Sequence, residues 1–470
     1  MHWRATLGAA LIVLVGAGCA SFDPAPAREP RVDPAALGAK PVDADWPTPD
    51  WWRRYHDPQL DSLITEALAG SPTLVAARAR IAKADAAAGI ARAATLPQVN
   101  GNLGGTYQRF SENYIYPPPY AGNWYADSRL SLDFTWELDF WNKNGAALQA
   151  ALSQAQAVAA EGETARVLLT TGVARAYFHL QRLFAQRSVS LAAITQREEV
   201  VRITNQRFIA GLDTRVEVRQ AEAALATVRT ELAQYEEGIA LARHQIAALV
   251  GAGPERGDSL QPRPLTDVPS AVLPPDVPLD LIGRRPEIVA SRWRVEATGY
   301  DIDVAKALFY PNVNLVAFAG FSAIGINKLI ETASGVAGVG PAIHLPIFEG
   351  GRLRANLRGR EADADLAIAS YNQSVIDGAR DVADALSSIR ALAVTTAEQR
   401  KARTATTAAY DLAVIRYKAG LGNYLSVLTS QSQELIQDRL DADLTARAFE
   451  LDINLVRALG GGYLDPVTTR

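Results

Sequence analysis

The segment SRLSLDFTWELDFW, residues 128–141, carries the clearest structural signal in this chain. Apolar and polar side chains alternate along it without interruption. The apolar set is Leu130, Leu132, Phe134, Trp136, Leu138 and Phe140, and the polar set is Arg129, Ser131, Asp133, Thr135, Glu137 and Asp139. Because a period of two places successive side chains on opposite faces of a strand, this segment predicts a β-strand with one apolar face and one charged face.

The length of the segment favours a membrane-spanning strand over a half-buried strand of a soluble sheet. The alternation runs for about 12 residues, whereas an ordinary strand has roughly 5–6 and a tilted membrane-spanning strand roughly 9–11. Aromatic side chains stand near both ends, where the two membrane surfaces lie along such strands. They are Trp124, Tyr125, Phe140 and Trp141. We therefore expect the polar side chains Arg129, Asp133 and Glu137 to face a water-filled lumen.

The N-terminus has the pattern of a secretory signal. Arg4 precedes the apolar residues 5–15, and small residues then lead to Cys19, which is the single cysteine of the chain. The arrangement resembles a bacterial lipobox, although Gly16 stands where that motif usually has leucine. It predicts a signal peptide at residues 1–18, cleavage before Cys19 and acylation of its thiol. The alternative is an ordinary secretory signal in which the cysteine is incidental.

Composition bears on three further features: an extended tether, a nucleic-acid partner and transmembrane helices. Residues 19–50 contain repeated proline and few large aliphatic side chains, which predicts a lipidated, extended tether. The net charge of −4 gives no indication of a nucleic-acid partner. After the N-terminus, the chain contains no apolar run of about 18 residues, so we expect no transmembrane helix.

The second half of the chain repeats the pattern of the first. LPQVN at residues 96–100 resembles YPNVN at 310–314, and RFIAGL at 207–212 resembles RYKAGL at 416–421. The offset is about 210 residues throughout, which indicates an internal duplication. Each half is predicted to contain a helix, two strands separated by a loop, and two long helices separated by a break.

The predicted boundaries follow from this duplication. The first structural repeat is residues 51–270, the second is 271–462, and a tail occupies 463–470. The strands are expected at about 97–110, 127–141, 311–322 and 336–348.

Four membrane strands pose a physical problem, because four strands cannot close a barrel and open sheet edges are not tolerated in lipid. The strands must therefore complete a barrel with copies of the same chain. The long helices carry many charges, so we expect them to project into an aqueous compartment and pack against one another. The fold class predicted is mixed, with a long α-helical barrel and a transmembrane β-barrel to which each chain contributes four strands.

Three motifs resemble those of TolC-like outer-membrane efflux proteins. They are LIGRRPEI at residues 281–288 with FYP at 309–311, PIFEGGR at 346–352, and RYxxG at 416–420 with Tyr424 and Leu425. The resemblance runs from about residue 51 to residue 462, and the signal with Cys19 resembles the NodT-type lipoprotein branch.

The resemblance implies a homotrimer with a shared twelve-stranded barrel in the outer membrane. It also implies a periplasmic helical tunnel that reaches an adaptor protein and an inner-membrane transporter. Such a protein is a lipid-anchored, passive exit duct for small molecules such as drugs in an RND-type system, and it needs no cofactor. A duct for type I protein secretion or for metal efflux is the alternative within the family.

The breaks between the long helices are expected at the periplasmic end of the tunnel. Gly211 and Leu212 in the first half, and Gly420 and Leu421 in the second, are expected to dock the adaptor. Leu425 matches an apolar position that narrows the aperture in relatives. Many relatives carry aspartate where Thr429 stands, so we expect an apolar or hydrogen-bonded gate rather than a cation-binding one.

Two other classes of protein agree less well with the sequence. An enzyme needs a cluster of reactive side chains, but the histidines are scattered and no HExxH, phosphate-binding loop or GxSxG motif occurs. These histidines are His2, His56, His179, His244 and His344. We therefore expect no catalytic residue and no metal site. A lipid-anchored periplasmic coiled-coil scaffold without a pore is disfavoured by the alternating strands.

Overall fold

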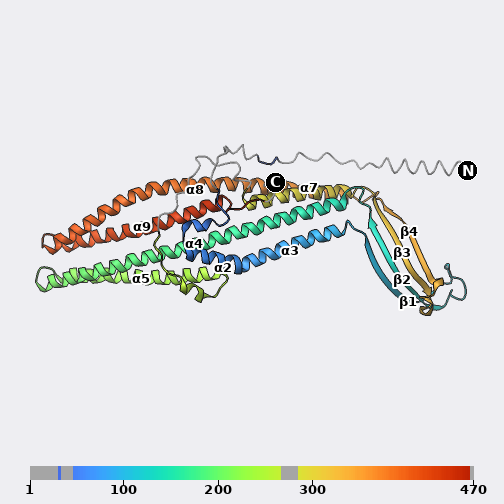
Figure 1. Ribbon diagram of the computed structural model, residues 1–470, viewed down its shortest axis with the longest axis horizontal. Helices are drawn as coiled ribbons and strands as arrows, with labels where there is room; N and C mark the ends of the chain where they lie inside the picture. Colours follow the sequence, from blue (N-terminus) through green and yellow to red (C-terminus); the bar gives the residue numbers. More distant parts are fainter. Residues whose placement is uncertain (1–29, 33–45, 266–283, 466–470) are drawn as a thin grey trace. The chain divides into compact units, whose positions relative to one another are not determined.

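The computed structural model describes residues 30–32, 46–265 and 284–465 (Figure 1). The predicted signal peptide, Cys19, most of the tether, residues 281–283 of the first family motif and the last five residues of the predicted tail lie outside the described residues.

Long helices and four strands make up the described chain. The helices are α2 Pro58–Gly70, α3 Pro72–Ala93, α4 Lys143–Ile209, α5 Arg215–Val250, α7 Pro286–Ala307, α8 Arg352–Lys418 and α9 Tyr424–Ala458. The short 3-10 helices are η2 Trp51–Tyr55, η3 Pro254–Ser259, η4 Ile326–Lys328 and η5 Thr332–Ser334. The strands are β1 Gln98–Arg109, β2 Trp124–Glu137, β3 Asn312–Ile324 and β4 Gly335–His344. None of the helices that the structure describes combines the length and apolar composition needed to cross a membrane.

The chain divides into two compact units, and helices α3, α4, α7 and α8 pass from one to the other. The strand unit includes Ile81–Val158 and Ser291–Tyr371, and the helix unit includes Val32–Arg80, Ala159–Ala290 and Asn372–Arg470.

The strand unit contains one antiparallel sheet in the order β1-β2-β3-β4 (Figure 1). The register places Val99 of β1 beside Phe134 of β2, which lies beside Ala317 of β3 and then Val339 of β4. One face therefore carries apolar side chains from all four strands, whereas Val316 and Phe318 of β3 lie on the opposite face beside Thr135 and Asp133. The first strand of this sheet and the last each pair with a described strand on one side only.

The predicted ends of two strands differ from the observed ones. β2 ends at Glu137 rather than 141, because the chain turns there: Asn142 has φ 57° and Asp139 accepts a hydrogen bond from the Gly145 N–H at 2.8 Å. β2 also begins three residues earlier than expected, since Trp124 pairs with Arg109.

β4 likewise ends before the predicted residue 348. Its last residue, His344, pairs with Asn312, the first residue of β3, so no partner strand continues. Pro346 also lacks the N–H that a longer strand would require. As a result, the apolar residues that follow each strand lie outside the sheet. Ile347 and Phe348 are each 90% exposed.

The helix unit is held by a buried apolar cluster between α4, α5, α9 and the short N-terminal helices. Tyr177 of α4 is fully buried in it and donates a hydrogen bond to Asp57, the N-cap of α2, at 2.6 Å. Trp51 and Phe449 belong to the same cluster. Burial of this apolar surface holds α4, α5 and α9 side by side.

Candidate functional site at the helix-to-helix turns

The two long helical hairpins, α4 with α5 and α8 with α9, reverse through turns of the same geometry (Figure 1). Gly211 has φ 73°, and its N–H donates to the Phe208 carbonyl at 3.0 Å while the Leu212 N–H donates to the Arg207 carbonyl at 2.9 Å. This pair of bonds closes the end of α4, and glycine is favoured there because it adopts positive φ without a Cβ clash.

The second hairpin repeats this geometry residue by residue. Gly420 has φ 73°, its N–H donates to the Tyr417 carbonyl at 3.0 Å, and the Leu421 N–H donates to the Arg416 carbonyl at 2.9 Å. A Cβ placed on either glycine would meet open space. The backbone conformation, rather than crowding, therefore accounts for glycine at both turns.

Each return helix begins with a capped N-terminus. Thr214 and Glu217 form a capping box at the start of α5, and Asn423 accepts a hydrogen bond from the Ser426 N–H at 3.0 Å at the start of α9. Between each glycine and its cap, a leucine points outward. Leu212 is 65% exposed and Leu421 is 72% exposed, so each turn presents an apolar side chain to its surroundings.

A hydrogen-bonded link joins the two hairpins next to these turns. The Tyr417 hydroxyl of α8 donates to Asp213 at 2.5 Å, and the Arg207 guanidinium of α4 donates to the same carboxylate at 3.0 and 3.3 Å. Arg207 also donates to the Tyr417 carbonyl at 3.2 Å, and its guanidinium lies over the Tyr417 ring at 4.5 Å from the centroid. Tyr417 is only 1% exposed, whereas the side chains of Arg207 and Asp213 remain partly exposed.

The protonation states support this link. Burial, together with the hydrogen bond to Asp213, raises the pKa of Tyr417 to about 12. The hydrogen bond to the same carboxylate raises the pKa of the Arg207 guanidinium. The phenol therefore remains a donor and the guanidinium remains charged at physiological pH.

Among the described residues this link occurs once, because Phe208 of the first half, which has no hydroxyl, stands where the second half has Tyr417, and because the residues after the glycine also differ. The sequence after the glycine is LDT in the first half and LGN in the second, so Gly422 stands where the first half has Asp213. Arg207, Asp213 and Tyr417 were not predicted as site residues, although Tyr417 belongs to the RYxxG motif. The differences between two otherwise matching turns were the further signal in the sequence.

The predicted gate residues lie on α9 just beyond the second turn. Leu425 is exposed, and the Thr429 hydroxyl donates to the Leu425 carbonyl at 2.8 Å. The hydroxyl proton is therefore used within the helix. An open groove of about 620 Å³ lies beside this turn, between the last turns of α8 and the first of α9, and Arg416, Gly420, Leu421 and Asn423 are among the residues that line it.

The predicted lumen-facing residues lie on the sheet of the strand unit. Arg129, Asp133 and Glu137 share the face of β2 opposite to the apolar one. Asp133 accepts hydrogen bonds from Asn102 at 2.6 Å and from Ser131 at 3.0 Å.

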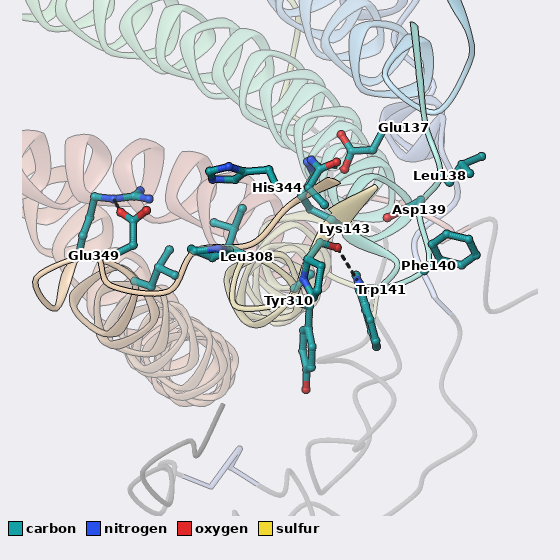
Figure 2. Close-up of a pocket in the computed structure, with 16 residues that line it drawn as sticks. Glu137, Leu138, Asp139, Phe140, Trp141, Lys143, Leu308, Tyr310, His344 and Glu349 are labelled. Atoms are coloured by element: carbon teal, nitrogen blue, oxygen red, sulfur yellow. Dashed lines mark hydrogen bonds and ion pairs between the residues drawn. The ribbon is translucent and has the colours of Figure 1, made fainter. Parts of the chain in front are cut away.

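A small pocket of about 140 Å³ lies where the strands meet the helices (Figure 2). Its charged side chains form local ion pairs: Lys143 with Glu137 at 2.6 Å, and Arg352 with Glu349 at 2.7 Å. Trp141 stacks on Tyr310 and donates to the Pro311 carbonyl at 2.9 Å (Figure 2). These pairings indicate a structural junction between the sheet and the helices.

His344 also lines this pocket. In the part of the chain that the structure describes, no group of three or more His, Cys, Asp or Glu side chains is arranged to hold a metal ion.

Comparison with known proteins agrees with this architecture. The family model described as outer membrane efflux protein matches residues 63–252 and 277–461. The chain belongs to the outer membrane efflux protein family. This is a family of channel proteins rather than of enzymes.

Alignments with related proteins span most of this efflux protein. It is 40% identical over 371 residues to the fusaric acid resistance protein FusA of Burkholderia cepacia, covering 76% of this chain and 70% of that one. It is 32% identical over 427 residues to the multidrug resistance outer membrane protein MdtP of Shigella flexneri, covering 89% and 87%. Among solved structures, the outer membrane protein VceC of Vibrio cholerae aligns with a TM-score of 0.83 and 37% identity, covering 89% of this chain and 100% of that one. The predicted family and fold class are thereby confirmed.

Proposed function

We propose that this efflux protein is the outer-membrane duct of a tripartite, RND-type efflux system and that it works as a homotrimer. Its substrates are small molecules such as drugs, as the names of the multidrug resistance relatives and of the fusaric acid resistance relative suggest. An inner-membrane transporter supplies the energy and an adaptor connects the two membranes.

The main observation behind this proposal is the four-stranded sheet, which has one apolar face and two outer edges that no described strand pairs with. Unpaired backbone N–H and C=O groups are too costly to leave in lipid, so β1 must pair with β4 of another copy. Three copies give a closed barrel of twelve strands, which is within the range of outer-membrane barrels. The apolar face then meets lipid, and Arg129, Asp133 and Glu137 line a wet lumen.

The matching turns at Gly211 and Gly420 support the assignment of residues 51–270 and 271–462 as two structural repeats. They also make a suitable docking site for the helical hairpins of an adaptor, because each presents an exposed leucine at the end of a hairpin. We place the resting closure beside them, with Leu425 and Thr429 at the aperture. The Arg207–Asp213–Tyr417 link holds the two hairpins together in this closed state.

We also propose that the N-terminus is anchored to the membrane by a lipid. Acylation of Cys19 after removal of residues 1–18 places the N-terminus at the inner leaflet of the outer membrane. The barrel spans the membrane, so membrane attachment does not depend on this anchor.

The proposal is tested by reconstituting the purified protein in planar bilayers and by complementing a strain that lacks the gene. Pores must appear in the bilayer, and efflux must return in the strain. Gly420→Asp should leave a folded trimer that no longer supports efflux or cross-links to the adaptor, because a charge is placed on the docking surface. Gly420→Asn is the matched control, since asparagine also adopts positive φ but carries no charge.

Absence of pores from correctly folded protein would contradict the duct. Normal efflux and normal adaptor cross-linking by the Gly420→Asp variant would instead show that this turn is not the docking site.

A further inference from the structure

One charged side chain on the polar face of the sheet is unlike the others. The three carboxylates of β2 on this face each have a polar or ionic partner. These pairs are Asp127 with Gln108 at 3.3 Å, Asp133 with Asn102 at 2.6 Å, and Glu137 with Lys143 at 2.6 Å. Arg129 has no ion pair or hydrogen bond with any residue that the structure describes, and it is exposed. Its guanidinium N–H groups are therefore available to a ligand, although Asp133 attracts it at longer range.

The contact that Arg129 does make is with an aromatic ring. Its guanidinium carbon lies 5.4 Å from the centroid of Phe318 on β3. Phe318 points to the polar face, where a large apolar side chain is unexpected, and it is 38% exposed. A guanidinium over a ring is held by cation–π attraction, which orients the planar group without using its N–H donors.

Glycines make room for this pair. Gly338 lies beside Phe318 in the register, and a Cβ at that position would come within 2.7 Å of the ring. Gly104 lies beside Arg129, and a Cβ there would have no neighbour within 4 Å. The ring therefore rests against β4 where a larger residue cannot stand, and the wall beside the guanidinium is open.

We propose that Arg129 and Phe318 form a weak binding site for organic anions that carry a flat aromatic ring. The carboxylate or sulfonate of such a molecule accepts hydrogen bonds from the guanidinium edge. Its ring lies over the open wall at Gly104 or against Phe318. This inference rests on the proposed function, because the polar face lines a lumen only in the closed barrel.

The site fits a duct because it is exposed and holds its ligand by few contacts. A site in a conducting path must attract the passing molecule and still release it quickly. In a trimer, three copies of Arg129 place positive charges among carboxylates that stay negative at Asp127 and Asp133, because the partners of these two, Gln108 and Asn102, are neutral. The structure thus assigns aromatic organic anions as one substrate class of the duct.

The test uses the full-length protein in planar bilayers, with 1-naphthoate, acetate and 1-naphthylmethylammonium as separate probes of transient block. In the unmodified pore, 1-naphthoate should block at a lower concentration than either of the other two. Arg129→Gln should raise its half-blocking concentration about two- to fivefold, the factor expected for one exposed ionic contact. It should also shift the reversal potential in a potassium chloride gradient toward cation selectivity.

Three further variants test the aromatic ring, test the open space beside the guanidinium, and provide a control. Phe318→Leu should weaken block by 1-naphthoate but leave the reversal potential unchanged. Gly104→Val should do the same by filling the open wall. Arg109→Gln is the matched control, because Arg109 lies on the other face of the sheet and pairs with Glu112 at 2.7 Å, so its removal should change neither measurement.

The proposal is overturned if pores form normally but Arg129→Gln and Arg109→Gln give the same block and reversal potential. It is also overturned if acetate and 1-naphthoate block the unmodified pore alike. Failure of the unmodified protein to form pores would contradict the duct itself, so the two failures are distinguishable.

Discussion

Tyr417→Phe isolates the link between the two hairpins, because it removes one hydroxyl and leaves the ring in place. The hydroxyl belongs to a buried tyrosine and donates to Asp213 at 2.5 Å, and a hydrogen bond to a charged group contributes roughly 1.5–3 kcal/mol. Asp213 keeps its two bonds from Arg207 in this variant, and Arg207 keeps its contact with the ring. We therefore expect the lower end of this range, about 1.5 kcal/mol.

This free energy sets the expected change in gating. At about 1.4 kcal/mol per factor of ten, loss of the hydroxyl should raise the ratio of open to closed channels roughly tenfold. The assay is the resting open fraction of single channels in planar bilayers, measured without adaptor or transporter. Asp213→Asn should have a larger effect, because it also weakens the bonds from Arg207.

A matched control is available on the same helix. Tyr410 is buried like Tyr417, but its hydroxyl accepts a hydrogen bond from Gln431 within the α8–α9 hairpin. Tyr410→Phe should leave the resting open fraction unchanged. If Tyr417→Phe also leaves it unchanged, while Leu425→Ser opens the channel, the link does not hold the closed state.

The raised pKa of Tyr417 also predicts how the closed state responds to pH. The pKa of Tyr417 is raised from 10.0 to about 12, so the folded state favours the protonated phenol. The stabilisation is complete below the ordinary tyrosine pKa and is lost as the pH rises through the folded-state value. The phenol therefore stays protonated across the neutral pH range, so we expect this link to leave the resting open fraction constant there.

Three further outcomes follow. Leu132→Arg should destabilise the trimer in the membrane by roughly 2–4 kcal/mol if Leu132 meets lipid, whereas Asp133→Asn should be tolerated; a larger assembly defect for Asp133→Asn in semi-native gels would invert the assignment of the two faces. Leu425→Ser should raise resting conductance and sensitise cells to large antibiotics, and unchanged conductance would remove this residue from the gate. Cys19→Ala should abolish acylation and leave pore formation intact; mass spectrometry of the mature wild-type protein showing an unmodified N-terminal cysteine would contradict lipidation.

Local sequence was sufficient to predict the elements whose geometry depends on near neighbours. Alternation in residues 128–141 predicts a strand with two unlike faces, since side-chain direction in a strand depends only on parity. Glycine in the two AGL turns predicts helix ends with positive φ, because that conformation is disfavoured for other residues. Both features appear in the structure, at β2 and at Gly211 and Gly420.

Strand ends and contacts between residues far apart in the sequence could not be predicted from the local sequence pattern. The alternation continues to Phe140, yet β2 ends at Glu137, because the chain turns at residues 139–142 before α4 begins. Asp213 and Tyr417 are 204 residues apart, and Arg129 and Phe318 belong to strands from different halves of the chain. Such contacts depend on how the folded elements are placed in three dimensions, and no periodicity in the sequence records that placement.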